Sequence, residues 1–259
     1  MKCGESDNRN LEFEKNFNIE DYFKSLINTN KPTVFDVGAH HGESIHFFNN
    51  IWPNSLIHAF EPDPNSCSSI SKHFSNVLIN NIGLSDVNGK LPFYMQTITH
   101  LNSLKKIKSD SMDSLGYAKE AENFKIDVNV SRGDDYVKGN NIEKIDLLKI
   151  DVQGNEINVL KGFRNCLNLI DVIIVEISFY DFYETKNSFF DLEQVIRNRF
   201  ELWDILKISK NPKNYRTDWA ELVYKKKVVG KSIKQPKFKC ETFENFSKNI
   251  LLFDLQDHR

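Results

Sequence analysis

The chain has 259 residues, 40% hydrophobic and 12% aromatic, which suits one substantial globular domain with short extensions. Its 34 basic and 36 acidic side chains give a formal net charge of −2 at pH 7, so the basic surface typical of nucleic-acid-binding proteins is not expected. The four cysteines are widely spaced and form no C-x-x-C pair, which argues against a zinc or disulfide framework.

Residues 1–31 are predicted as an N-terminal helical extension, because between residues 11 and 27 the apolar side chains recur at near-helical spacing. The first residues contain no apolar signal-peptide core. No later stretch reaches the length of a membrane span, so we expect a cytoplasmic protein without one.

Residues 32–228 are predicted as the main domain, in which short apolar strands alternate with helices. Strands are expected at 33–38, 55–60, 77–80, 90–95, 124–130, 144–150 and 170–177, with an antiparallel closing pair at 200–208 and 219–225. Helices are expected at 42–50, 65–74, 156–163 and 191–198, a turn at 84–89, and a long loop or lid at 96–124. This alternation predicts an α/β fold with a doubly wound, mostly parallel sheet and an antiparallel closing strand.

Residues 229–259 are predicted as a C-terminal tail that is helical in part. Phe243, Phe246, Ile250 and Phe253 could form an apolar stripe along one helix. Packing of this helix on its own chain is favoured, and a homodimer helix stays open as the alternative.

A glycine loop, Asp36-Val-Gly-Ala-His-His-Gly42, follows the first predicted strand. In open α/β sheets ligands bind outside the carboxyl ends of the strands, which is where this loop lies. Gly38 permits close approach of the backbone to a ligand, and Gly42 opens the next helix, whose free N–H groups attract an anion. The adjacent His40 and His41 are more typical of surface groups at a helix start than of catalytic bases.

Glu61 ends the second strand, in the sequence Phe60-Glu-Pro62. A carboxylate here can accept hydrogen bonds from both hydroxyls of a ribose, which indicates a nucleoside ligand. The glycine loop lacks both the G-x-G-x-x-G pattern of dinucleotide sites and the G-x-x-x-x-G-K-[ST] pattern of phosphate loops. S-adenosylmethionine has no phosphate and tolerates the histidine side chains, so it is the predicted cofactor.

Acidic residues follow the strands at 144–150 and 170–177. Asp151 is the first candidate for orienting or deprotonating an acceptor hydroxyl, and Glu156 is the second. Helix capping explains Glu156 equally well, because it lies in the first helical turn. No third ligand stands at a telling spacing from Asp151 and Glu176, so no metal site is predicted. The residues predicted to bind the acceptor are His100, Asn102, Ser103 and Glu176.

Several segments, in this order along the chain, resemble the FkbM-type methyltransferase family. They are Val34–Gly42, Phe60–Pro62, Asn81–Asp86, Asn102–Leu104, Leu147–Glu156, Val175–Ile177 and Asp218–Tyr224. The resemblance covers residues 32–226, and motifs in the expected order are far more specific than any one of them alone.

The resemblance implies a class I methyltransferase fold, S-adenosylmethionine as the methyl donor, and O-methylation of a sugar, a glycan or another small metabolite. The predicted cofactor-binding residues are Asp36, Gly38, His40, Gly42, Glu61, Asn81 and Gly83. The chain departs from the family pattern at His40, where Asn is usual, and at Gln153, where Glu is frequent.

Two other functions stay open at this level. A nucleic-acid methyltransferase would carry a D/N-P-P-Y or Pro-Cys signature at the fourth strand, where Asp151-Val-Gln-Gly154 stands instead. A non-catalytic scaffold that kept the fold would bind the cofactor without turnover. The acceptor itself is not identified by any motif in the sequence.

Overall fold

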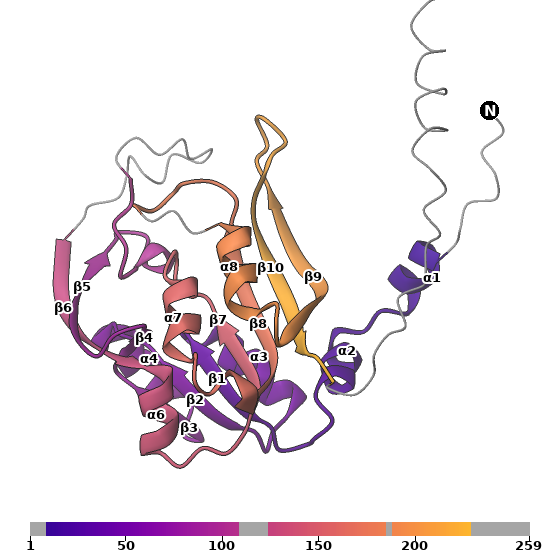
Figure 1. The fold of residues 1–259 in the computed structure, drawn as a ribbon, viewed down its shortest axis with the longest axis horizontal. Helices are drawn as coiled ribbons and strands as arrows, with labels where there is room; N and C mark the ends of the chain where they lie inside the picture. The colour runs from indigo at the N-terminus through magenta and orange to yellow at the C-terminus, as the bar shows by residue number, and fades with distance from the viewer. Residues whose placement is uncertain (1–8, 109–123, 185–187, 229–259) are drawn as a thin grey trace, which may run out of the picture. The chain divides into compact units, whose positions relative to one another are not determined.

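Seven strands form the central sheet of the computed structural model, which describes residues 9–108, 124–184 and 188–228 (Figure 1). The order across the sheet is β3–β2–β1–β7–β8–β10–β9. The strands are β1 Thr33–Val37, β2 Leu56–Phe60, β3 Val77–Asn80, β7 Ile145–Ile150, β8 Ile170–Ser178, β9 Phe200–Lys210 and β10 Thr217–Lys226. Neighbouring strands are parallel except for β10, which is antiparallel to β8 and β9. The predicted fold class is confirmed.

Helices cover both faces of this sheet, as Figure 1 shows for α7 and α8 on one side and α3 on the other. The first face packs against α6 (Gly133–Gly139), α7 (Glu156–Gly162) and α8 (Phe189–Ile196), and the second against α2 (Ile19–Leu26), α3 (Glu43–Ile51) and α4 (Pro64–His73). The N-terminal segment also contains α1 (Arg9–Asn16), so helices lie where the helical extension was predicted. The tail predicted at 229–259 lies outside the described residues.

Short sequence signals set where these helices begin. The Asn18 side chain accepts the backbone N–H groups of Glu20 and Asp21, which caps α2. Ser188 and Asp191 form a reciprocal capping box at the start of α8. No helix in the described part of the chain is long and apolar enough to cross a membrane.

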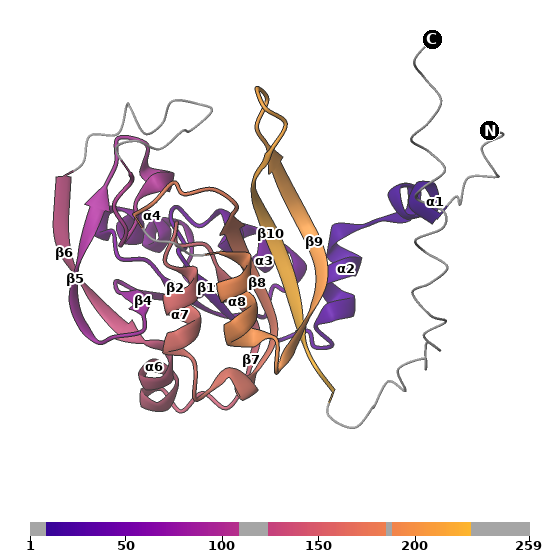
Figure 2. The same cartoon turned by 45° about the horizontal axis from the view of Figure 1, so that its top comes forward.

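A second sheet of three strands, in the order β4–β6–β5, differs from the sequence prediction. It consists of β4 (Gly83–Ser85), β6 (Phe124–Arg132) and β5 (Gly89–Met95), and Figure 2 shows it away from the hairpin of β9 and β10. The turn expected at 84–89 is therefore partly wrong, since Leu84 and Ser85 belong to a strand. That strand is only three residues long and pairs with residues 130–132, so its partner is distant in sequence.

The direction in which the chain crosses the sheet reverses between β1 and β7. From β1 the chain proceeds outward through β2 and β3, and it later begins β7 on the other side of β1. A crevice opens at the carboxyl ends of the strands at such a switch point. The loops after β1 and β7 therefore face a common space.

One face of the sheet changes from apolar to polar toward these carboxyl ends. Side chains alternate between faces along a strand. Leu147 on β7 and Ile174 on β8 belong to the apolar cluster under α2 and α3. The next positions on the same face are Lys149 and Asp151 after Leu147, and Glu176 after Ile174. Charged groups thus replace the core where the crevice begins.

Candidate active site

A cavity of about 660 Å³ lies at this switch point. Its walls come from the loops after β1, β2 and β7, from β8, β9 and β10, from α2 and α3, and from residues 99–104. A cavity of this size and mixed polarity is typical of a site for a small-molecule ligand. It contains most of the residues that the sequence singles out.

At two positions of the glycine loop the backbone adopts dihedral angles that are strained for any residue other than glycine. Gly38 has a φ of +87°, and a Cβ placed there would lie 1.8 Å from the carbonyl oxygen of Asp151. Gly42, at the start of α3, has a φ of +94°, and its Cβ would lie 2.6 Å from the Phe74 ring. The absence of a side chain at Gly38 lets the loops after β1 and β7 touch. Gly38 lines the cavity, whereas Gly42 lies behind it.

Glu61 is buried at the end of β2, with both carboxylate oxygens turned toward backbone donors. Oε2 accepts the N–H of His40 at 2.9 Å, and Oε1 accepts the N–H of Asp63 at 2.8 Å. Burial raises the pKa of Glu61 to about 7, although these two hydrogen bonds act in the opposite direction. The carboxylate thereby fixes the glycine loop against the loop after β2.

His40 lines the cavity through a ring held on both sides. Nδ1 lies 3.4 Å from the Glu43 carboxylate and Nε2 lies 3.0 Å from the Thr99 hydroxyl. Burial and the neighbouring His41 lower the pKa of His40, so its ring is neutral at neutral pH. His40 also has a φ of +48°, a region that Asn adopts more readily than His.

Of the other residues predicted to bind the cofactor, one lines the cavity and two hold the surrounding loops from outside it. Gly83 on β4 lines the cavity. Asn81 instead donates from its amide to the carbonyl oxygens of Glu61 and Pro62, both at 3.0 Å, and so holds the loop after β2 from outside. Asp36 is fully buried beneath the cavity floor and accepts a 2.6 Å hydrogen bond from the Ser44 hydroxyl. Burial raises the pKa of Asp36.

Lys149, which the sequence did not single out, sits between the two strand-end acids. Its ammonium is 3.8 Å from Asp36 Oδ1 and 3.5 Å from Asp151 Oδ2. Burial disfavours the charge, but Asp151, Asp36, Glu221 and Glu176 outweigh burial and raise the pKa of Lys149. Lys149 is therefore a permanent cation in the floor of the cavity.

Gln153 joins the acids Asp151 and Glu176, which follow or end neighbouring strands. Its amide nitrogen donates to Asp151 Oδ1 at 2.9 Å and to Glu176 Oε1 at 3.2 Å, while its carbonyl oxygen accepts the Tyr183 hydroxyl at 2.9 Å. Burial and the nearby Asp151 and Glu156 raise the pKa of Glu176 well above its usual value. The neutral amide separates two carboxylates that a Glu at 153 would repel.

Glu156 does not face the cavity, so the prediction of direct chemistry at this residue is corrected. Its carboxylate turns back onto its own loop and accepts the N–H groups of Gly154 at 2.9 Å and Val152 at 3.2 Å. Burial raises the pKa of Glu156 to about 7. Both donors precede α7, so the carboxylate supports the loop that carries Asp151 and Gln153.

The three residues expected to bind the acceptor from loop 96–124 have different roles. His100 and Asn102 line the cavity. Asn102 Oδ1 accepts the Gln96 N–H at 2.7 Å, and its buried amide nitrogen has no hydrogen-bond partner among the described residues. Ser103 is buried and its hydroxyl donates to the backbone carbonyl oxygen of Gln153 at 2.6 Å, so it ties this loop to the loop after β7. Residues 109–123 of the predicted lid lie outside the described residues.

No group of three or more His, Cys, Asp or Glu side chains is placed to hold a metal ion within residues 9–108, 124–184 and 188–228. Asp151 is paired with the ammonium of Lys149 and accepts a hydrogen bond from Gln153, and Glu61 accepts hydrogen bonds from backbone N–H groups. The arrangement suits acid–base and hydrogen-bonding chemistry.

Residues 36–201 match the model of the methyltransferase FkbM domain, which accounts for more than half of the chain. The chain belongs to the FkbM methyltransferase family. The matched region begins at Asp36 in β1 and ends at Glu201 in β9, so it contains the glycine loop, Glu61, Asp151 and Glu176. The sequence resemblance extended further, to residue 226.

Three curated relatives of this FkbM-family chain are similar over part of their length. The 2-O-methyltransferase NoeI of Sinorhizobium fredii is 24% identical over 180 residues, or 62% of this chain and 69% of NoeI. The methyltransferase sdnD of Sordaria araneosa is 30% identical over 51% of this chain and 60% of sdnD. The hexuronic acid methyltransferase AglP of Haloferax volcanii is 26% identical over 47% of this chain and 46% of AglP. The chain thus spans about half to two thirds of the length of these relatives.

Part of the cavity of this FkbM-family chain comes from outside the matched region. Ile19 and Phe23 of α2 precede it, and Lys207, Trp219 and Glu221 of β9 and β10 follow it. The sequence did not identify these five residues as part of a site. The sequence did contain one signal for this part of the site. Glu221 lies among apolar residues of a predicted strand, and a charge that faces the core requires a partner or a ligand.

Proposed function

We propose that this chain transfers a methyl group from S-adenosylmethionine to a hydroxyl of a sugar or another small metabolite. The observation that carries the proposal is the Asp151 carboxylate at the end of β7, in the same cavity as Gly38 and Glu61. A nucleoside site and an acid–base group thus share one space at the switch point of the sheet.

The donor side fits a nucleoside with an amino-acid tail. Each oxygen of Glu61 accepts one backbone N–H and keeps a lone pair for a ribose hydroxyl. The buried amide nitrogen of Asn102 would be satisfied by an acceptor atom on a ligand, since no described residue supplies one. When bound, S-adenosylmethionine supplies an electrophilic methyl carbon, whose bond to sulfur breaks with the electron pair remaining on sulfur.

Asp151 is the residue that we assign to the acceptor hydroxyl. Lys149 and Gln153 fix its two oxygens, at 3.5 Å and 2.9 Å, so the carboxylate is held in one orientation. It can accept the hydroxyl proton while the acceptor oxygen forms its bond to the methyl carbon. Alignment of the two reactants supplies the remainder of the acceleration.

The name of one relative supports transfer to an oxygen atom, and the name of another supports a sugar as acceptor. NoeI is named a 2-O-methyltransferase, and AglP is named for hexuronic acid. A nucleic-acid acceptor is less well supported, because the chain has a net charge of −2 and its cavity carries more carboxyl groups than lysines.

The test compares the unaltered protein with Asp151→Asn, by calorimetric titration of S-adenosylmethionine and by transfer of its labelled methyl group to sugars. We expect the variant to bind the cofactor as the parent does and to lose about 100-fold or more in turnover. Absence of cofactor binding by the parent, or undiminished turnover in the variant, would contradict the proposal.

A further inference from the structure

Four cavity residues form a continuous wall across the strands β8, β10 and β9. Glu176 on β8 is opposite Glu221 on β10, and Glu221 is opposite Lys207 on β9. Trp219 lies two residues before Glu221 and so on the same face of β10. These residues are called here the acceptor wall: Glu176, Lys207, Trp219 and Glu221.

The acceptor wall and the donor residues lie on opposite sides of Asp151. Along the sheet, Glu61 follows β2 and Gly38 follows β1, whereas the wall occupies the three strands beyond β7. Adjacent strands are about 4.8 Å apart, so β10 lies roughly 10 Å from β7, which is about the length of one or two sugar rings. A molecule against the wall can therefore reach Asp151 without entering the donor side.

We propose that the acceptor wall binds the acceptor and selects an uncharged sugar ring over a uronate. This inference rests on the proposed function and adds to it the class of acceptor and the residues that recognise it. It also assigns recognition to β9 and β10 beyond residue 201, where the family match ends.

The chemistry of the wall suits a polyhydroxylated ring. Carboxyl groups and an ammonium group supply acceptors and donors for hydroxyls. The indole of Trp219 offers an apolar surface for the C–H face of a pyranose. Lys207 Nζ is 5.0 Å from the centre of the Trp219 ring, so the ammonium is kept beside this surface.

The charge of the cavity disfavours an anionic ring. Its lining contains the carboxyl groups of Glu43, Glu61, Asp151, Glu176 and Glu221 but only the lysines Lys149 and Lys207. The charge of Lys149 is already shared between Asp36 and Asp151. A uronate or a phosphorylated sugar at the wall would meet the carboxyl groups of Glu176 and Glu221, and the one lysine of the wall, Lys207, already lies opposite Glu221 and interacts with its charge.

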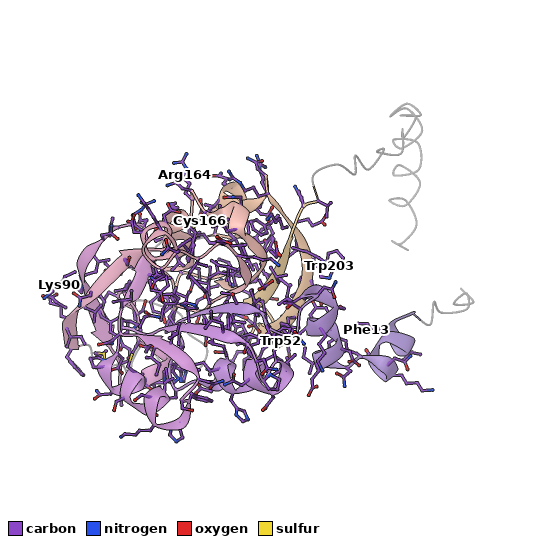
Figure 3. The ribbon with its side chains drawn as sticks, turned by 90° about the horizontal axis from the view of Figure 1, so that it is seen from below. Phe13, Trp52, Lys90, Arg164, Cys166 and Trp203 are labelled. Carbon is purple, nitrogen blue, oxygen red and sulfur yellow. The ribbon has the colours of Figure 1, made fainter. Side chains whose placement is uncertain are left out.

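The experiment measures methyl transfer to nitrophenyl glycosides of neutral hexoses and to the matching hexuronides, with cofactor affinity measured separately by calorimetry. The test variant is Trp219→Ala. The matched control is Trp203→Ala, because Trp203 also lies in β9–β10, also has a lysine over its ring (Lys225 Nζ at 4.7 Å), and is exposed outside the cavity (Figure 3).

We expect kcat/KM for neutral glycosides to be at least about tenfold higher than kcat/KM for the hexuronides. A tenfold ratio is the effect expected when the hexuronide makes one unfavourable charge contact that the neutral glycoside does not make. Trp219→Ala should raise KM for the neutral acceptor about tenfold with an unchanged cofactor Kd, Trp219→Phe should restore most of the loss, and Trp203→Ala should behave as the parent. Glu221→Lys should narrow the gap between the two acceptor classes.

Three results would overturn the inference: preference for hexuronides, equal losses in Trp219→Ala and Trp203→Ala, or no transfer to any neutral glycoside by a protein that binds the cofactor. Failure of the unaltered protein to bind S-adenosylmethionine would instead refute the proposed function. The two failures are thus separated by the calorimetric measurement.

Discussion

The substitution Glu61→Gln tests the donor site most directly. In the structure each oxygen of Glu61 accepts one backbone N–H, from His40 at 2.9 Å and from Asp63 at 2.8 Å. Glutamine keeps the size and one acceptor oxygen but replaces the other oxygen with an NH2 group, which cannot accept. One ribose hydroxyl then loses its charged partner.

The expected loss follows from the strength of such a bond. A hydrogen bond to a charged group contributes about 1.5–3 kcal/mol, so the Kd for S-adenosylmethionine should rise roughly 10- to 150-fold. Glu143→Gln is the control, because Glu143 is exposed and does not line the cavity. Thermal unfolding of both variants shows whether the fold is retained.

The pH dependence provides a second, independent measurement. Burial raises the pKa of Glu61 to about 7 in the free protein, and the ribose hydroxyls bind the carboxylate form. Affinity should therefore weaken as the pH falls below 7, by up to about tenfold per pH unit, and level off above 7. The Gln variant has no group to titrate at this position and should lose this component. Equal Kd values for parent and variant at pH 8.5, or the same pH slope in both, would refute the assignment of Glu61.

Two further substitutions test the loops around Asp151. Gln153→Glu replaces the amide that donates to Asp151 and Glu176 with a third carboxylate, so repulsion should turn the Asp151 side chain away and lower kcat about tenfold while the Kd for S-adenosylmethionine stays the same. An unchanged kcat would speak against a role for Asp151. Gly38→Ala should lower the free energy of unfolding in urea by ~2 kcal/mol or more, because its φ is +87° and its Cβ would lie 1.8 Å from a carbonyl oxygen. Gly139→Ala, whose Cβ meets nothing within 4 Å, should not be destabilised, and equal losses at both glycines would show that the contact is not the cause.

The main sheet could be predicted because its strands carry strong local signals. Strands β1 and β7 are apolar runs followed directly by Gly38 and Asp151, and β8 is an apolar run that carries Glu176 near its end. The carboxyl ends of these parallel strands meet at one edge of the sheet. The three-stranded sheet could not be predicted in this way. Its strand β4 has only three residues, and β6 pairs with it across about 45 positions of the chain, so no local pattern reveals the pairing.

Part of the candidate site could be named from the sequence, but the orientation of its side chains could not. Glu156 was equally consistent with capping and with chemistry, because both place a carboxyl group in the first turn of a helix. In the structure the Glu156 carboxylate accepts the N–H groups of Gly154 and Val152, which precede α7, so its orientation depends on the fold of this loop. Lys149 was missed because its partners, Asp36 and Asp151, are recognisable only once the register of β1 and β7 is known.

The position of β9 and β10 at one edge of the sheet has an evolutionary consequence. These two strands are consecutive in the chain, pair with each other, and touch the remainder of the central sheet through β10 alone. Phe200, Leu222 and Tyr224 are fixed in the core of the sheet, but the cavity-facing positions Lys207, Trp219 and Glu221 can diverge without touching the strands that carry Gly38, Glu61 and Asp151. On the proposed roles, side chains of this hairpin are where a change of acceptor would require the fewest changes in the rest of the protein.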